Sequence, residues 1–488
     1  MDKFFKIRER GSNVKLEIIG GLTTFFAMAY IILVNPNQVA AEGANGWLVG
    51  LGADPVAMGQ IWNSVYIASI LVAIFGTLLM ALYARLPFAQ ACGMGLNSFF
   101  CTCFISNAFF GGGDVIKGYQ AGLVIILLSG LIFLLLSVTG LRTHIARALP
   151  DALKKAIPGG IGLFIAFIGF KNASIVVDNQ YTFVQFFNFN AVINKIGVDG
   201  FTGADALKEM AAPIVAIIGL IIIAILTFKK VKGSVIIGIL AATVVYYLMT
   251  WTVPSFDMSQ IGQSFKDFAS VGLGGAFSAD AWKEAFNADY IGGVFSAIIL
   301  IITFCIVDMF DTIGTLYGTA SEAGMLDENG DPIDVNKAMT SDSLATVAGA
   351  IFGTSTCTTF VESASGVAAG ARTGLASLVT SACFVVCLFL SPFANIIPSA
   401  ATAPALIFVG VLMLKNFANV DMKDMRSAVP AFLTLVMMPL TYSISNGIGI
   451  GAISYVLITL FTGKYKKNDI VVTIIALLFV FKFIFGAI

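Results

Sequence analysis

The sequence predicts an all-α polytopic membrane protein, and three observations support this fold class. First, 58% of the 488 residues are hydrophobic and only 11% are charged, whereas soluble globular domains carry about 25% charged residues. Second, apolar runs recur along the whole chain with lengths near the ~20 residues that a spanning helix needs. Third, two of these runs are short and are preceded by glycine, proline or threonine. We therefore predict about 14 transmembrane segments.

The expected spans show a pattern that repeats. The third and tenth are too short for a hydrocarbon core that needs about 20 helical residues, and each follows a longer span. The same alternation recurs seven spans later, and because seven is odd, the two halves have opposite orientations. We predict 7+7 inverted repeats with spans at 19–38, 57–82, 93–110, 118–138, 157–175, 211–228, 232–252, 291–318, 339–353, 361–373, 374–392, 399–416, 427–442 and 446–462.

Charge sets the expected orientation and excludes some partners. Lys plus Arg equals Asp plus Glu at 28 each, so no global charge attracts nucleic acid. The amino terminus is basic and is followed by a long apolar run without a cleavage site, so we expect no removable signal peptide. Other basic clusters fall on the same side, which the positive-inside rule makes cytoplasmic: the 142–155 loop, Lys229 to Lys232, Lys423 with Arg426, and Lys464 to Lys467.

Metal and redox sites are not expected. The seven cysteines lie in apolar stretches and form no C-x-x-C pair. The single histidine, His144, falls in the basic 142–155 loop, where we expect a solvated surface role. A last apolar stretch, 469–487, contains Lys482 near its middle and forms either an interfacial helix or a fifteenth span. We therefore predict no cofactor and no metal ligand.

The first interrupted span begins after a break at residues 86–97. Pro87 stops the preceding helix, and Gly93 and Gly95 let the backbone approach a ligand. A half-helix is expected to start at Gly93 or Met94. The glycines alone are equally compatible with a helix-packing surface of small residues.

The second break, residues 353–366, is rich in threonine, which favours extended backbone. Irregular backbone at membrane depth must satisfy its hydrogen bonds within the protein. We therefore predict two short strands that precede half-helices in spans 3 and 10, with the two helix N-termini facing one cavity. Broken helices in inverted repeats point to a binding site at the membrane midplane. Electron-rich atoms of a planar heterocycle would suit the N–H groups at these helix ends.

Acidic residues lie inside the predicted spans. Asp308 and Asp311 share one helix face at i,i+3, and Glu362 follows the second break. A charge at membrane depth costs about 3 kcal/mol on insertion scales, which makes such residues functional candidates. Asp308 has a structural alternative, an ion pair with Lys171 or Arg372. Asp342, at the start of the ninth span, is interpreted as a helix cap.

At these residues the chain resembles the nucleobase-ascorbate transporter superfamily, and within it the AzgA-like branch of hypoxanthine, adenine and guanine permeases. The resemblance covers nearly the whole chain. The motifs that carry it are TFFAMAY at 24–30 with Asn35-Pro36, GMGLN at 93–97, DMFDTIGT at 308–315 and TFVESASGV at 359–367.

The resemblance implies a division into two kinds of domain, homodimers and proton symport in preference to Na⁺. The expected location is the bacterial inner membrane, which the chain crosses several times, with the N-terminus cytoplasmic by the positive-inside rule. The expected boundaries are 1–140 (core, spans 1–4), 141–290 (gate, spans 5–7), 291–395 (core, spans 8–11), 396–462 (gate, spans 12–14) and 463–488 (C-terminal hydrophobic or interfacial helix).

The resemblance also implies roles for individual residues. Asp311 and Glu362 would bind purine ring N–H groups, with Asn97 as a supporting donor or acceptor. Thr315 stands where uracil-type relatives have histidine, which favours a bicyclic purine. The expected substrate-binding residues are Asp311, Glu362, Asn97, Gly95, Met94, Thr315, Val361, Phe360, Ser363 and Met28, and the expected proton-coupling residues are Glu362, Asp311 and Asp308.

Together these features predict a secondary transporter, not an enzyme, that imports adenine, hypoxanthine or guanine by proton symport as its core moves against its gate. The alternative is a carrier of the same fold for an anion or for uracil or xanthine. Glu362 beside the break would repel an anion. An intramembrane aspartyl protease is disfavoured because Asp308 and Asp311 share one helix, whereas a catalytic dyad needs two approaching chains.

Overall fold

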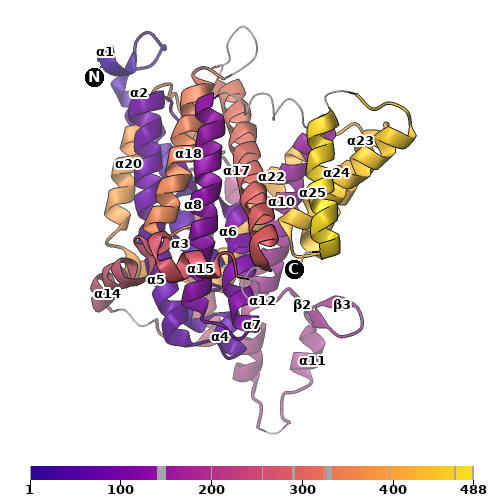
Figure 1. Ribbon diagram of the computed structural model, residues 1–488. Helices are drawn as coiled ribbons and strands as arrows, with labels where there is room; N and C mark the ends of the chain where they lie inside the picture. Colours follow the sequence, from indigo (N-terminus) through magenta and orange to yellow (C-terminus); the bar gives the residue numbers. More distant parts are fainter. Residues whose placement is uncertain are drawn as a thin grey trace.

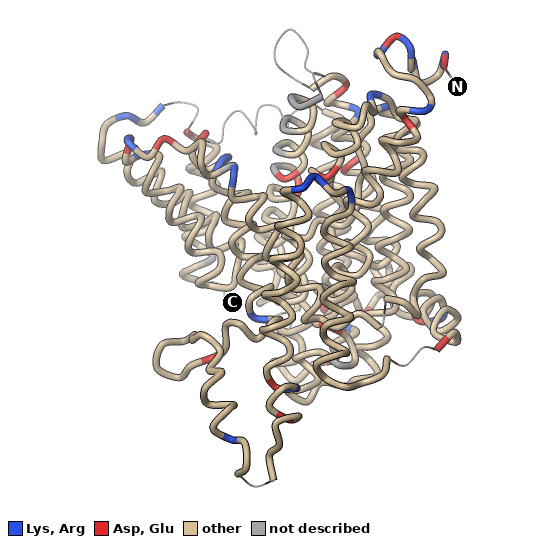
Figure 2. The backbone as a smooth tube through the Cα atoms, turned by 180° about the vertical axis from the view of Figure 1, so that it is seen from behind, with Lys and Arg blue, Asp and Glu red and all other residues tan. Residues whose placement is uncertain are grey.

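The computed structural model confirms the predicted class: apolar helices lie side by side, with charged residues concentrated toward their two ends (Figures 1 and 2). It describes residues 2–139, 150–198, 200–254, 257–287, 292–323, 325, 332–394, 396–466 and 469–485. His144 lies outside the described residues, as do residue 324 and residues 326–331 in the loop before α18 (Val335–Phe352). Within the described part, eight helices are long and apolar enough to cross a membrane, and five shorter apolar helices accompany them.

The first half of the chain follows the predicted order of spans. Asn13 and Asp54 cap the first two long helices by accepting hydrogen bonds from backbone N–H groups. The elements are α2 (Val14–Met28), α3 (Ile31–Val39), α5 (Pro55–Leu79), β1 (Gln90–Cys92), α6 (Met94–Phe100), α8 (Val115–Thr139), α10 (Asp151–Asn172), α12 (Gly203–Phe228) and α13 (Ser234–Thr250).

The second half repeats this order, including the strand before the short helix. Its elements are α17 (Gly293–Ala323), α18 (Val335–Phe352), β4 (Cys357–Thr359), α19 (Ser363–Ala368), α20 (Gly374–Cys387), α22 (Ser399–Leu414), α23 (Met425–Leu440) and α24 (Ile444–Phe461). A last helix, α25 (Ile470–Phe485), packs on α24 and α17.

The helices form two groups. In the first group, α2, α5, α8, α17, α18 and α20 pack around the strands and half-helices. In the second group, α10, α12, α13, α22, α23 and α24 pack mainly on one another. On α12, Ile217, Ile221 and Ile225 are exposed, and their spacing of four puts them on one face. That face is suited to contact lipid.

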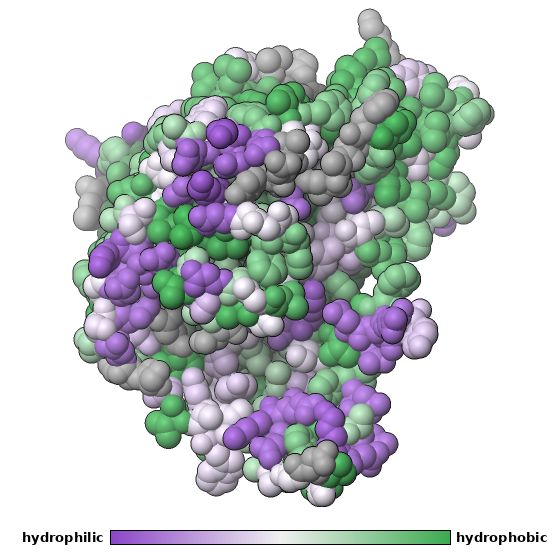
Figure 3. Space-filling view, turned by 60° about the horizontal axis from the view of Figure 1, so that its bottom comes forward, coloured by the Kyte–Doolittle hydropathy of each residue, from purple (hydrophilic) through white to green (hydrophobic). Residues whose placement is uncertain are grey.

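Two regions between the spans add elements that the hydropathy pattern does not predict. After α10, strands β2 (Val176–Asn179) and β3 (Phe183–Phe186) form an antiparallel hairpin at one end of the molecule. Polar residues gather on this end, and apolar residues cover much of the flank (Figure 3). The short helices α14 (Ser259–Asp267) and α15 (Ala279–Glu284) follow α13 in the chain but pack on α5 and α8 of the first group.

Close approach of α19 to α2 gives a first testable prediction. A Cβ atom on Gly366 would lie 2.0 Å from Thr24 Oγ1 and 2.6 Å from the Gly20 carbonyl oxygen. Gly366→Ala should therefore force the half-helix away from α2 and destabilise the protein by about 1–3 kcal/mol, measured as a lower melting temperature in detergent. Gly262→Ala on α14 is the control, because nothing lies within 4 Å of its added Cβ. Equal melting temperatures would contradict this packing.

Candidate functional site

A two-stranded sheet inside the membrane bundle positions the candidate site. Strands β1 and β4 pair antiparallel, with Ala91 opposite Thr358. Two further backbone hydrogen bonds extend the pairing, from Gly93 N to the Thr356 oxygen (2.9 Å) and from Phe360 N to the Ala89 oxygen (3.0 Å). Because the strands are antiparallel, α6 and α19 leave the sheet at opposite ends. This confirms the predicted strands before half-helices.

Two acids behind the sheet fix its position by hydrogen bonds to threonine side chains. Thr346 donates to Asp308 Oδ2 (2.7 Å), and its hydroxyl also bonds the Cys357 backbone. Thr312 donates to Asp342 Oδ2, and Gln90 Nε2 donates to Asp342 Oδ1 at 3.0 Å. Both acids are buried. They tie α17 and α18 to the two strands.

These contacts correct one expectation and decide between two alternatives. Asp342 is not a helix cap, because α18 begins at Val335 and Asp342 lies inside it; hydropathy placed the start too late because the first turns of α18 are polar. Asp308 pairs neither with Lys171 nor with Arg372. Lys171 lies over the rings of Trp47 (5.2 Å) and Tyr442 (5.3 Å), and the Arg372 guanidinium donates to backbone carbonyls.

In front of the sheet lies a cavity of about 440 Å³. Its wall contains seven of the residues that the sequence predicted for substrate binding: Met94, Gly95, Asp311, Thr315, Phe360, Val361 and Glu362. The second helix group supplies the opposite wall with Pro158, Val409, Leu412, Met413 and Lys415. Thr358, Thr359, Ala364 and Ser365 complete it.

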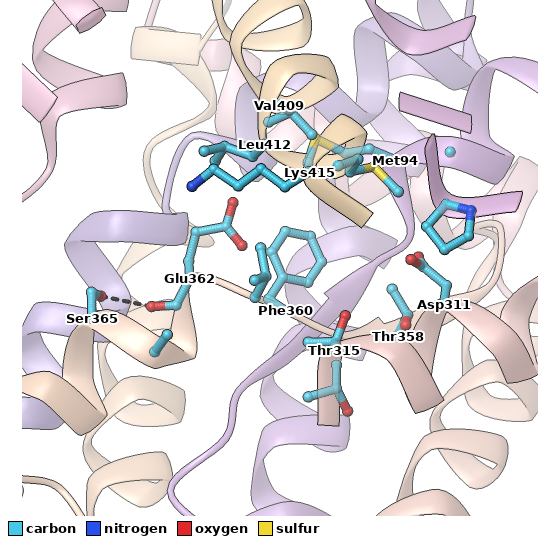
Figure 4. A pocket seen from close by; sticks show the side chains of 16 residues that line it. Met94, Asp311, Thr315, Thr358, Phe360, Glu362, Ser365, Val409, Leu412 and Lys415 are labelled. Atoms are coloured by element: carbon cyan, nitrogen blue, oxygen red, sulfur yellow. Dashed lines mark hydrogen bonds between the residues drawn. The ribbon is translucent and has the colours of Figure 1, made fainter. Parts of the chain in front are cut away.

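The two acids flank an aromatic ring in this cavity. Figure 4 shows the Phe360 side chain between the Glu362 and Asp311 carboxylates. Tyr30 on the α2–α3 connection donates its hydroxyl hydrogen to Glu362 Oε1 at 2.5 Å. Glu362 itself precedes the first turn of α19. A flat ring with N–H groups on two edges could therefore lie against Phe360 and donate to both carboxylates.

The other three predicted binding residues do not line the cavity. Asn97, Ser363 and Met28 are fully buried. Ser363 Oγ accepts a hydrogen bond from Ala89 N (3.0 Å) and so holds the end of β1. Neither polar atom of the Asn97 side chain has a hydrogen-bond partner among the described residues.

Sequence reasoning gave no role to Tyr30 or to the residues of the second group. Tyr30 lies within one of the motifs, but its contact with Glu362 joins residues 332 positions apart. Lys415 lies at the end of the predicted span 399–416, directly after α22, which by itself indicates only a helix end at the membrane surface. Which helices of the second group face the cavity depends on packing that periodicity does not encode.

Comparison with known proteins identifies relatives over the full chain. The sequence profile described as the Permease family matches residues 15–450. The guanine/hypoxanthine permease PbuG of Bacillus subtilis strain 168 is 38% identical over 488 residues, covering 99% of this chain and 100% of PbuG. The adenine permease AdeP of Escherichia coli strain K12 is 34% identical over 492 residues, covering 99% of this chain and 96% of AdeP.

A solved structure shares the fold. The transmembrane domain of the cyanobacterial bicarbonate transporter BicA aligns with a TM-score of 0.58 at 14% identity, covering 89% of this chain and 97% of that chain. At this identity the likeness concerns the fold alone. It agrees with the inverted-repeat architecture predicted from the spacing of the spans.

Proposed function

The chain belongs to the Permease family, the family of nucleobase-ascorbate transporters, and we propose that its cavity carries purine nucleobases across the bilayer. Membership makes it a multi-pass transport protein and not an enzyme. The observation that carries the proposal is the position of Asp311 and Glu362 on either side of Phe360 (Figure 4). A mostly apolar cavity with a few convergent polar groups is typical of a small-molecule site.

The pair of acids supports a purine more than an anion. Two carboxylates accept hydrogen bonds and repel negative charge, so they match ring N–H groups. Relatives over the full chain are named as guanine/hypoxanthine and adenine permeases. A bicarbonate transporter shares the fold, but at 14% identity it indicates nothing about this cavity.

We propose proton symport, with the proton held by an acid of the site. Glu362 and Asp311 line the cavity, where a proton can arrive with the substrate. Asp308 is the third candidate, because one of its carboxyl oxygens has no hydrogen-bond partner among the described residues. Gain and loss of one proton on such a carboxyl would link the substrate to the proton gradient.

We also propose alternating access in which the first helix group, as core, moves against the second, as gate. The cavity contains Pro158 and Lys415, near the N-terminal part of α10 and just after the C-terminal end of α22. At the other ends of the same helices, a second cavity of about 350 Å³ contains Lys171, Ser399 and Glu42. Burial raises the pKa of the Glu42 carboxyl to about 7, which the Ser399 hydroxyl opposes by a hydrogen bond. Both cavities lie along the boundary between the two helix groups, which we call the seam. Two cavities at opposite ends of this seam suit a site that opens to alternate sides of the membrane.

Contact across this seam gives a second prediction. A Cβ atom on Gly95 would lie 2.3 Å from Ile161 Cγ2 on α10, so the half-helix and the gate helix are closely packed here. Gly95→Ala should lower the rate of purine uptake several-fold because the seam can no longer close. Ile161→Ala combined with Gly95→Ala should restore part of the rate. If the double variant is as slow as Gly95→Ala, the added methyl acts on the substrate and not on the seam.

Orientation, location and assembly complete the proposal. We propose a cytoplasmic N-terminus, supported by basic clusters that share one side of the bundle, in a bacterial inner membrane. The homodimer is proposed from the family resemblance. Thiol labelling of a cysteine placed at Lys3, compared between sealed cells and lysed cells, tests the orientation.

The decisive experiment is uptake by the purified protein. Proteoliposomes with an inward proton gradient should accumulate labelled guanine, hypoxanthine or adenine, and a protonophore should abolish accumulation. A Na⁺ gradient without a proton gradient should not support it. Failure to take up any of the three purines would contradict the proposed substrate, whereas uptake insensitive to the protonophore would contradict only the proton coupling.

A further inference from the structure

A cation lines the purine cavity. Lys415, directly after α22, is the one Lys or Arg among the described residues that line it. Its side chain extends across the cavity, with the ammonium group on the side of Glu362 and not of Asp311 (Figure 4). None of the ion pairs found among the described residues involves Lys415.

The two acids and the lysine differ in what they can bind. A carboxylate accepts hydrogen bonds, and an ammonium group only donates them. Glu362 and Lys415 therefore form an acceptor beside a donor at one end of the cavity, while Asp311 is an acceptor at the other end. A matching ligand needs an N–H donor beside an acceptor on one edge and a second N–H on the opposite edge.

Purines with an oxygen at C6 have this pattern, and adenine has its reverse. In guanine and hypoxanthine, N1–H lies beside the O6 acceptor, and the imidazole ring carries an N–H at the far end. Guanine adds an amino group at C2, which points to the same side as N1–H. In adenine, N1 is an acceptor and the C6 amino group is a donor, so the amino group would face the ammonium.

We propose that Lys415 is a specificity-determining residue that donates to O6 of a 6-oxopurine while Glu362 accepts from N1–H. Guanine and hypoxanthine are then preferred over adenine. This inference rests on the proposed purine transport and deepens it. Lys415 belongs to the second helix group and Glu362 to the first. The substrate would therefore form hydrogen bonds with both helix groups.

Substitution of Lys415 tests this role against a merely electrostatic one. Lys415→Met keeps an unbranched side chain that is shorter only by the terminal nitrogen, and so removes the donor. Affinities should be measured by competition with labelled hypoxanthine for binding to the purified protein, so that a variant unable to complete transport still gives a result. Lys415→Met should weaken guanine and hypoxanthine about tenfold to hundredfold, the range for a hydrogen bond to a charged group, and adenine less than about threefold.

Two controls sharpen the measurement. Lys423→Met removes an exposed loop lysine that does not line the cavity and should leave all affinities unchanged. Lys415→Arg should retain the preference for 6-oxopurines.

Three results would overturn the inference. They are adenine binding more tightly than hypoxanthine and guanine to the wild type, equal weakening of all ligands in Lys415→Met, and no change in any affinity in that variant. Equal weakening would identify Lys415 as a counter-ion of Glu362 alone. Absence of binding and uptake of every purine by the wild type would instead overturn the proposed function itself.

Discussion

Glu362→Gln is expected to reduce purine uptake to the background of empty vesicles while the protein remains folded in the membrane. The amide has nearly the shape of the carboxyl, so its oxygen can still accept from Tyr30. Its NH₂ group would face a ring N–H, however, and the loss of a hydrogen bond to a charged group costs about 1.5–3 kcal/mol. The amide also cannot hold a proton. Affinity loss and loss of coupling therefore act together.

Initial rates of uptake in proteoliposomes, normalised to reconstituted protein, measure this effect. Glu209→Gln is a matched control, because Glu209 is partly exposed and pairs with Lys195 at 2.9 Å on the surface, where such pairs contribute about 0–1 kcal/mol. A normal melting temperature should accompany the loss. Uptake by Glu362→Gln at the wild-type rate would remove Glu362 from the proposed site.

Asp311→Asn is expected to have a comparable effect for a partly different reason. Asp311 lines the cavity on the far side of Phe360 from Glu362, where it would accept from the imidazole edge of the purine. Asparagine can turn its oxygen toward that N–H, but the charge that strengthens the bond is lost. We expect binding to weaken about tenfold or more and uptake to fall to background.

Asp308→Asn separates binding from coupling. Asp308 does not line the cavity and accepts from Thr346 at 2.7 Å, a bond that asparagine can also accept. Purine affinity should therefore remain within about threefold of the wild type. If uptake by Asp308→Asn loses its dependence on the proton gradient, Asp308 holds the proton. Normal uptake by Asp311→Asn together with failed uptake by Asp308→Asn would contradict a substrate-binding role for Asp311 and make Asp308 the essential acid.

Much of the fold could be predicted because it depends on local composition. A run of about 20 apolar residues is determined by the bilayer thickness, and the structure has helices at each of the predicted positions. The break at residues 353–366 is read from its threonines, which favour extended backbone, and β4 occupies Cys357–Thr359 within it. The hairpin β2–β3 was not predicted. It lies between spans, where the length of an apolar run no longer indicates which structure the chain adopts.

The candidate site was predicted only on the side that carries unusual residues. An acid inside a span is conspicuous because hydrocarbon penalises it, and this signal identified Asp311 and Glu362. Gly95 was identified by its position in the break before a half-helix, where a glycine lets the backbone approach a ligand. Leu412 and Met413 have no such signal, because apolar residues are expected in any span. Asn97 and Ser363 are polar but do not line the cavity. Ser363 instead accepts from Ala89 N, because a sheet inside the membrane must satisfy its backbone hydrogen bonds within the protein.

The sequence by itself determined the membrane class, the repeat of interrupted spans and the acids that must avoid lipid, since each follows from the cost of placing a residue in hydrocarbon. Tertiary structure alone decided which groups meet. It brought Tyr30 to Glu362, Thr312 to Asp342 and Lys415 to the edge of the cavity. These contacts join segments far apart in the chain, and their geometry depends on how whole helices pack, which no local pattern of residues specifies.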